Sequence, residues 1–209
     1  MKKKRAKNYM IFRRPRSKAL KSLNNIYVIG RLTSGWIVEL KDKIKKLDTR
    51  KIHFEYPTQN GKSLKVARKK SKIIRLLDEK SRYDIYKESI ISSVTIFEQY
   101  LSQMLSVIYR IFPQKLKTNI KGEEIEKNIN INLLFEHESI SELIDYIIER
   151  QIISIIQCGP EKYFNLIGNV FSIQVRELPI DEFIEIKATR DLIVHNNGIV
   201  NATYIKKAA

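Results

Sequence analysis

The sequence contains very little cysteine, glycine or proline. Its one cysteine, Cys158, excludes an internal disulfide framework and is typical of a protein that folds in a reducing compartment. The 7 glycines and 5 prolines argue against collagen-like or low-complexity segments. With 43% hydrophobic residues the chain can build a core, so its composition indicates a folded protein rather than a disordered tail.

Long apolar runs are absent as well. No stretch approaches the roughly 20 consecutive apolar residues that a membrane-spanning helix requires. The first residues, 1–16, are strongly basic but lack the continuous apolar segment of a secretory signal. We therefore expect a soluble cytoplasmic protein without a membrane partner.

Acidic residues are scarce in the first part of the chain. Residues 1–82 hold 26 Lys and Arg but only 6 Asp and Glu, whereas residues 83–209 hold 13 and 17. The net charge of +16 therefore divides into +20 and −4. This split predicts two regions, 1–82 and 83–209. The basic region is expected to contact a nucleic acid or another partner, because lysine and arginine neutralise phosphates and release counterions. A plain solubilising surface is the alternative.

The basic region carries mixed signals of secondary structure. Residues 1–22 have the composition of a basic arm with few core residues. Three β-favouring runs, 26–32, 36–40 and 51–57, are compatible with a small β-sheet. Residues 36–46 also tolerate a helix, so both interpretations stay open for that stretch.

Further along the chain the apolar spacing becomes helical. An Asn-Gly pair within 57–63 predicts a turn, and a basic helix is expected over 64–82. Over 83–112, spacings of three and four residues predict a helix with one apolar face. The residues on that face are Ile90, Val94, Phe97, Leu101, Leu105 and Ile108.

After a polar connection at 114–132, the remaining helices have recognisable ends. Ser139 and Glu142 form a capping-box pattern that begins a second helix. Gly198 stands where a left-handed residue ends a helix, and Asn201 is a cap for a last short one. The expected helices cover 139–157, 160–174, 180–197 and a few residues after 201. The fold class that follows is mainly α, an antiparallel helical bundle preceded by the basic region with its possible small sheet.

The segment RDLIVHNNGIVN, residues 190–201, combines features that suggest a functional site. On an ideal helix Arg190 falls within an apolar stripe, which is costly unless its guanidinium meets an anion. The stripe consists of Phe183, Ile186, Ile193 and Val194. Glu88, Glu98, a partner chain and a ligand phosphate are the candidate anions.

The spacing within this segment suggests how its polar residues are arranged. Asp191 and His195 are four residues apart and share one edge of the helix, where the carboxylate can orient the imidazole. Arg190 and His195 are five apart, roughly 140° around the helix, so they do not share a face. A distorted helix, a curled arginine or a seam between two copies of the chain would bring them together, and we favour the seam. An ordinary helix end with polar cap residues is the simpler alternative.

The residues 188–208, ATRDLIVHNNGIVNATYIKKA, resemble the signature helix of HEPN-domain proteins. Many members of this all-α family are ribonucleases of toxin–antitoxin and anti-phage systems. Arg190, Asp191 and His195 match the family motif, with Asp191 in a position where Asn is more usual. Residues 88–109 also resemble the first helix of the family, so the similarity spans roughly 83–207.

The resemblance implies an endoribonuclease that cleaves RNA at a homodimer cleft without a metal or a cofactor. In that interpretation His195 is the general acid or base and Arg190 binds the scissile phosphate. Asp191 and Asn196 orient the imidazole or the substrate. The expected partners are RNA, a second copy of the chain, and an antitoxin or a phage-derived trigger.

Two other functions are compatible with the sequence. The chain could be a non-catalytic nucleic-acid-binding or scaffold protein in which Arg190 pairs with an acidic side chain. It could also be an interaction module that senses a phage component through residues 1–82. A metal site is not expected, because His53, His137 and Cys158 are scattered without ligand spacing.

Overall fold

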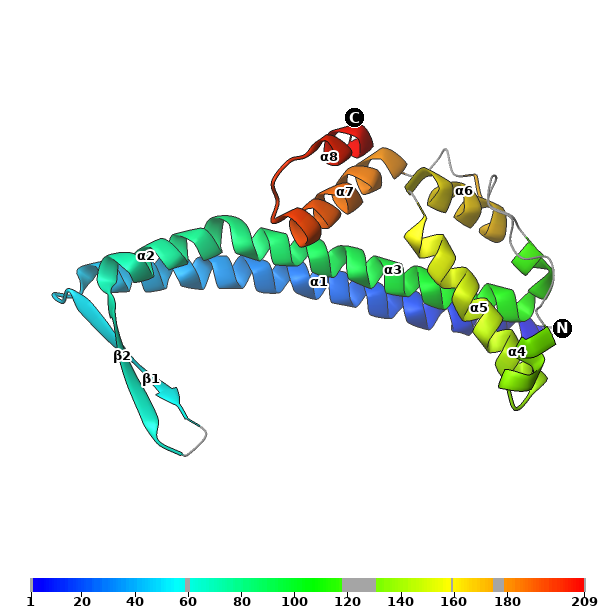
Figure 1. The fold of residues 1–209 in the computed structure, drawn as a ribbon, viewed down its shortest axis with the longest axis horizontal. Helices are drawn as coiled ribbons and strands as arrows, with labels where there is room; N and C mark the ends of the chain where they lie inside the picture. The colour runs from blue at the N-terminus through cyan, green and yellow to red at the C-terminus, as the bar shows by residue number, and fades with distance from the viewer. Residues whose placement is uncertain (1, 59–60, 118–130, 159, 175–178, 209) are drawn as a thin grey trace. The chain divides into compact units, whose positions relative to one another are not determined.

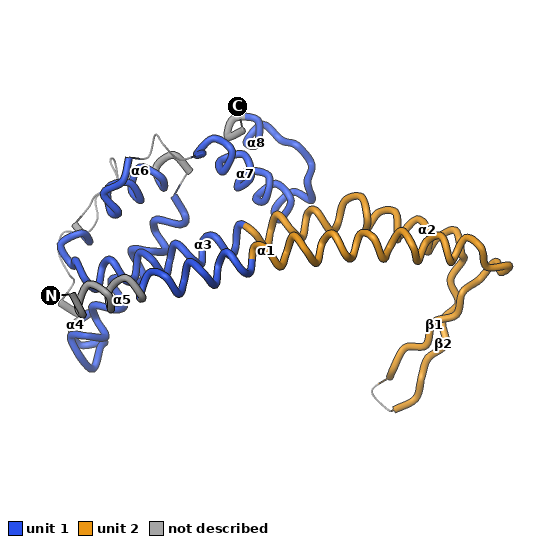
Figure 2. The backbone as a smooth tube through the Cα atoms, turned by 180° about the vertical axis from the view of Figure 1, so that it is seen from behind, with its two compact units in different colours: residues 1–22, 94–209 blue, residues 23–93 orange. Residues whose placement is uncertain are grey.

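The computed structural model describes residues 2–58, 61–117, 131–158, 160–174 and 179–208. The fold is mainly helical with one antiparallel β-hairpin, as predicted (Figure 1). The chain forms two compact units, one of residues 1–22 and 94–209 and one of residues 23–93 (Figure 2). This division differs from the charge boundary at residue 82, because helices α1 and α3 each run through both units.

Helix α1, Lys2–Lys46, replaces the predicted basic arm and two of the predicted strands. The β interpretation of 26–32 and 36–40 was wrong, and the helical alternative for 36–46 was right. The buried and half-buried positions Ile26, Gly30, Ile37 and Ile44 follow helical spacing along one side. Gly30 faces Ile85 and Ser89 of the antiparallel helix within its unit. Packing between helices therefore overrides the β propensity of the isoleucines and valines.

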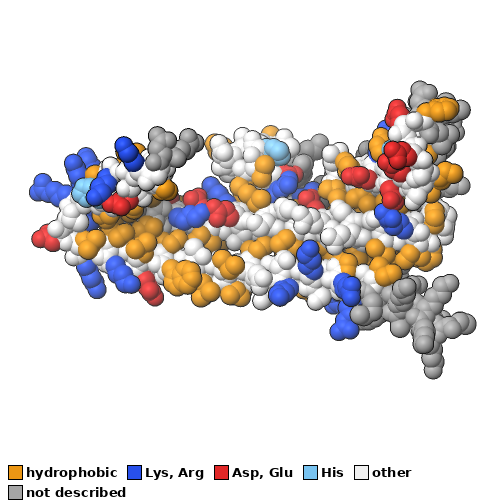
Figure 3. All heavy atoms as spheres, turned by 90° about the horizontal axis from the view of Figure 1, so that it is seen from below, with side chains coloured by type: hydrophobic (Ala, Val, Ile, Leu, Met, Phe, Trp, Pro, Cys, Tyr) orange, Lys and Arg blue, Asp and Glu red, His pale blue; other side chains and the backbone are white. Residues whose placement is uncertain are grey.

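Strand β1, Lys51–Pro57, confirms the third β-favouring run. It pairs antiparallel with β2, Ser63–Lys69, in a register that places Lys51 opposite Lys69 and Phe54 opposite Val66. The predicted helix at 64–82 was wrong over its first residues, because Leu64 and Val66 alternate with polar residues and pair with β1. Figure 3 shows Lys and Arg side chains gathered at the left, where this hairpin lies.

Three consecutive helical segments follow the hairpin. Helix α2, Lys70–Glu79, continues through a π-helical turn, Lys80–Asp84, into α3, Ile85–Ile111. The apolar face predicted for α3 is confirmed: Val94, Leu101, Leu105 and Ile108 are buried.

The unit of residues 1–22 and 94–209 is built around a core between α3, α5 (Ile140–Gln157) and α6 (Pro160–Phe171). Shorter segments connect them: a 3₁₀ turn at Pro113–Lys117 and α4, Ile131–Glu136. The rest of the predicted polar connection, 118–130, lies outside the described residues. Tyr109, Ile155, Tyr163 and Val170 are closed to solvent in this core. Among the described residues, no helix has the length and apolar character needed to cross a membrane.

The cap predicted at Ser139 is confirmed, and the carboxylate of Glu142 bonds the N–H one residue before the cap rather than that of Ser139 itself. The Ser139 hydroxyl accepts a hydrogen bond from the backbone N–H of Glu142 at 3.2 Å. The Glu142 carboxylate in turn accepts one from the N–H of Glu138 at 2.9 Å. Side chains of the first turn thus replace the carbonyl partners that helix-start N–H groups lack.

Candidate active site at the α7–α8 turn

Helix α7, Ile180–Asn196, ends in a tight left-handed turn. Asn197 and Gly198 have φ angles of 52° and 79°, which confirms the left-handed position predicted for Gly198 and adds its neighbour. The N–H of Gly198 donates to the carbonyl of Leu192 at 3.0 Å, and that of Ile199 donates to Asn196 at 2.9 Å. These bonds occupy carbonyls left free at the helix end and turn the chain back on itself.

Helix α8, Ala202–Ala208, starts at the predicted cap. The side-chain oxygen of Asn201 accepts from the N–H of Tyr204 at 2.8 Å. The hydroxyls of Tyr204 and Thr189 are hydrogen bonded at 3.2 Å, which links α8 to α7. Helices α7 and α8 and the turn between them therefore enclose a common space.

That space is an open pocket of about 400 Å³. It is lined by Ala188, Asp191, Leu192, His195, Asn196, Asn201, Thr203 and Tyr204. His195 is exposed, and Asp191 and Asn196 are half-buried. The structure thus brings together three of the four predicted site residues, and the spacing of four residues had placed Asp191 and His195 on one edge of the helix.

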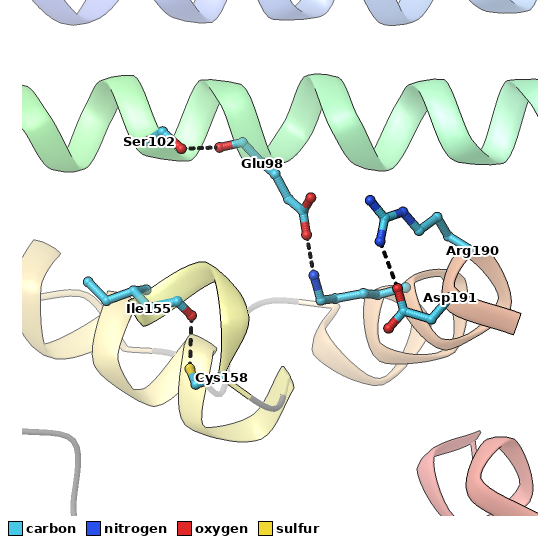
Figure 4. Close-up of polar contacts among 7 residues, drawn as sticks. Glu98, Ser102, Ile155, Cys158, Arg190 and Asp191 are labelled. Atoms are coloured by element: carbon cyan, nitrogen blue, oxygen red, sulfur yellow. Dashed lines mark hydrogen bonds and ion pairs between the residues drawn. The ribbon is translucent and has the colours of Figure 1, made fainter. Parts of the chain in front are cut away.

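Arg190 is the predicted site residue that does not line this pocket. Figure 4 shows its side chain directed from α7 towards α3. Its guanidinium donates to the carboxylate of Asp191 at 2.8 Å, with 25% and 29% of the two side chains exposed. Its Nε is buried and has no hydrogen-bond partner within the described part of the chain. Asp191 therefore contacts both the arginine and the histidine pocket.

The predicted apolar stripe of α7 was wrong in two positions, because Ile186 and Val194 are exposed. The buried side chains are Lys187, Ala188 and Leu192. Helix α7 packs through two faces. One carries Phe183, whose ring lies 4.6 Å from that of Phe97 on α3. The other faces α8 and the pocket.

A buried ion pair lies beside Arg190 on the first of these faces. Lys187 pairs with Glu98 of α3, and only 9% and 14% of the two side chains are exposed. Glu98 was a candidate partner for Arg190, but Lys187 occupies it. Glu88, the other candidate, pairs with Lys80. The position of Glu98 directly after the core residue Phe97 indicates that its carboxylate lies near the core and needs a cation. The sequence does not indicate which cation pairs with it.

Tyr163 of α6 lies against this ion pair. The Lys187 ammonium is 5.9 Å from the centre of its ring. Burial, and next the negative charge of Glu98, raise the pKa of the Tyr163 phenol well above its ordinary value. The phenol is therefore part of the core, closed to solvent and neutral.

The three scattered residues excluded as metal ligands lie apart from the pocket lining. The Cys158 thiol donates to the carbonyl of Ile155 at 2.9 Å, and the ring of His137 packs on Tyr146 at 5.0 Å. His53 lies on β1. No group of three or more His, Cys, Asp or Glu residues with metal-site geometry occurs in the described residues.

Comparisons with protein-family models, with curated proteins and with solved structures found no match to this chain. The likeness to HEPN proteins consequently rests on the sequence of residues 188–208 and 88–109.

Proposed function

We propose that the chain is a metal-independent endoribonuclease of the HEPN type that acts as a homodimer. The observation that carries the proposal is the open pocket between α7 and α8, which His195, Asp191 and Asn196 line together. An exposed imidazole beside a carboxylate and an amide is a suitable arrangement for acid–base chemistry on a bound polar substrate.

RNA supplies its own nucleophile in this reaction. His195 removes the proton of the 2′-hydroxyl, whose oxygen attacks the adjacent phosphorus. The bond from phosphorus to the 5′-oxygen breaks, and that oxygen takes up a proton from water. The products are a 2′,3′-cyclic phosphate and a 5′-hydroxyl. A guanidinium next to the phosphate offsets the charge that develops in the transition state.

A second copy of the chain supplies the arginine in this proposal. Within one chain Arg190 is directed towards α3, whereas His195 lines the pocket beside α8. The two groups therefore approach one phosphate most readily across a two-fold seam, where one copy contributes Arg190 and its partner contributes His195. In this proposal a phosphate of the RNA replaces Asp191 as the partner of the guanidinium.

The test is cleavage of RNA by the purified chain in the presence of EDTA. Cleavage is expected to persist in EDTA and to yield cyclic-phosphate ends. It is expected to fall at least about a hundredfold in His195→Ala and Arg190→Ala, as for loss of a general base or a phosphate ligand. His137→Ala is the matched control, since it removes a histidine outside the pocket. Equal activity in the two site variants would contradict the proposal.

A non-catalytic nucleic-acid-binding protein is the second candidate. The half-buried Arg190–Asp191 pair supports it, because an arginine whose charge is already paired within its own chain needs no substrate phosphate. In that case RNA binds without being cut, and His195→Ala leaves every phenotype unchanged. If the first candidate holds, the family resemblance further points to a toxin or anti-phage effector controlled by an antitoxin or a phage-derived trigger.

A further inference from the structure

The net positive charge of the unit of residues 23–93 comes from one segment of it. Residues 41–72 carry 12 Lys and Arg against 3 Asp and Glu, a net charge of +9. The flanking segments 23–40 and 73–93 are each neutral, with one and four residues of either sign. The whole charge of this unit therefore lies where α1 ends, the β-hairpin begins and α2 starts.

The backbone brings these three elements together at the base of the hairpin. The Lys70 ammonium donates to the carbonyls of Lys45 and Leu47, at 3.1 and 2.8 Å, and so closes the end of α1 against the start of α2. The N–H of Lys70 donates to the carbonyl of Arg50 at 3.0 Å and extends the hairpin ladder. Lys70 thus has a structural role in joining these elements.

Six cations at this junction are exposed and form no ion pair with any described residue. They are Lys43, Lys46, Arg50, Lys51, Lys69 and Lys72, and we call them the hairpin-base cations. Of the three acidic residues in 41–72, Asp42 pairs with Lys45 and Glu55 with Lys65, so that Asp48 is the one that forms no ion pair with a described residue.

The arrangement of the hairpin-base cations is unfavourable in the free protein. Lys51 and Lys69 are directly opposite each other in the strand register, and like charges in that position destabilise a hairpin. A two-stranded hairpin is only marginally stable to begin with. A bound polyanion would turn this repulsion into attraction by placing a negative charge between the two ammonium groups.

We propose that the hairpin-base cations bind the phosphodiester backbone of a nucleic acid. Six exposed cations from three elements match a ligand with regularly repeated single charges, and binding releases the counterions condensed on it. This goes beyond the proposed function, because it assigns binding to a different unit from the His195 pocket and does not require cleavage.

An anionic membrane is the rival ligand, and the hairpin disfavours it. Alternation along the strands places Phe54, Leu64 and Val66 on one face and Lys51 and Lys69 on the other. A membrane surface binds an apolar face and nearby cations together. In this hairpin the two faces are opposite, so an apolar face inserted into lipid would leave Lys51 and Lys69 pointing away from the membrane surface.

The test is fluorescence anisotropy with a labelled single-stranded RNA oligonucleotide and with RNA and DNA duplexes, from about 50 to 200 mM KCl. The full chain carrying His195→Ala serves as the parent, so binding is measured whether or not the protein is a nuclease. Adding Lys51→Gln, Lys69→Gln and Lys72→Gln is expected to raise the Kd for the single strand about tenfold or more. The slope of log Kd against log salt should fall by about 2.

Two matched triple variants remove the same charge elsewhere. Arg75→Gln, Arg82→Gln and Lys87→Gln alter the neutral part of the same unit and are expected to change the Kd less than about twofold. The second triple variant tests the basic start of α1 as a competing site, by changing Arg13, Arg14 and Lys18 to Gln.

The proposal is overturned if the hairpin-base variant retains the Kd and salt slope of its parent. It is also overturned if the Kd of either control variant rises as much as that of the hairpin-base variant. Tighter binding to phosphatidylserine vesicles than to any nucleic acid would also overturn it. If the hairpin-base variant folds poorly, the proposal is tested instead by backbone hydrogen exchange of the parent protein with and without RNA. RNA must slow exchange of backbone amides in 51–57 and 63–69, and unchanged exchange counts against the proposal.

Discussion

Lys187 and Glu98 form an ion pair between α7 and α3 that is almost closed to solvent. Removing one partner leaves the other charge buried without compensation. We expect Lys187→Met or Glu98→Gln alone to lower the free energy of unfolding by about 3–5 kcal/mol. The double variant Lys187→Met/Glu98→Leu should recover most of that loss, because apolar side chains replace both charges. Urea denaturation followed by circular dichroism measures all three.

A surface ion pair provides the control. Lys45 and Asp42 are more than half exposed, so Lys45→Met should change the free energy of unfolding by no more than about 0.5 kcal/mol. If Lys187→Met proves equally mild, the lysine reaches water and the pair does not hold α7 in place.

Tyr163 gives the core a predictable response to alkali. Burial raises the pKa of its phenol above the ordinary value of about 10, so the folded state favours the neutral form. The stability that depends on this neutral phenol is present below pH 10 and declines as pH rises further, because the unfolded chain ionises first. Tyr163→Phe removes the ionisation. The urea midpoint of the variant, relative to that of the unsubstituted chain, should therefore rise between about pH 10 and 11. A difference between the two midpoints that stays constant across that range would refute this account.

Residue-scale reasoning from the sequence was most reliable where the interaction is local. Asp191 and His195 line one pocket because residues four apart lie on one edge of a helix. The partner of Arg190 was not predictable in the same way, since it depends on the rotation of α7 against α3. The buried face of α7 includes Lys187, three residues before Arg190, and Lys187 is therefore the cation that meets Glu98.

At the scale of elements, α1 contains one glycine whose replacement is expected to stabilise the helix. Gly35 lies within the helix, and a Cβ at that position would meet no atom within 4 Å. Gly35→Ala should therefore raise the free energy of unfolding by about 0.5–1 kcal/mol, because alanine loses less backbone entropy on folding. Thermal melting of the full chain measures the change.

The hairpin turn supplies the opposite case. Gly61 has open space around it but a φ of +70°, a conformation that L side chains adopt with strain. Gly61→Ala should lower stability by about 1 kcal/mol despite the identical chemical change. If both substitutions shifted the melting temperature in the same direction, backbone conformation would not be the deciding factor.

At the scale of the whole molecule, the proposed seam makes a prediction about mixtures. If Arg190 and His195 of different copies complete each site, Arg190→Ala and His195→Ala proteins should complement each other. In an equal mixture half of the dimers are mixed, and each holds one intact site of two. About a quarter of the natural RNA cleavage should therefore return.

The mixture also separates this arrangement from a site within one chain. Sites contained in a single copy would stay inactive in every dimer, so the mixture would show no recovery. Mixing either variant with itself, after the same dissociation and reassociation, is the control for recovery caused by handling.

Several features follow from the sequence by itself. They are the apolar face of α3, the Ser139 cap, the left-handed turn after α7 and the concentration of positive charge in 1–82. Each depends on residues within one or two helical turns or on composition, so no distant part of the chain alters it.

The tertiary structure decided the rest. Residues 26–40 favour strands locally, yet the helical row Ile26, Gly30, Ile37 buries itself against an antiparallel helix and makes them part of α1. The faces of α7 were settled in the same way, by packing of Phe183 on Phe97 and of Tyr204 on Thr189. The physical reason is that such choices differ little in local free energy, and burial against partners distant in sequence is large enough to select one.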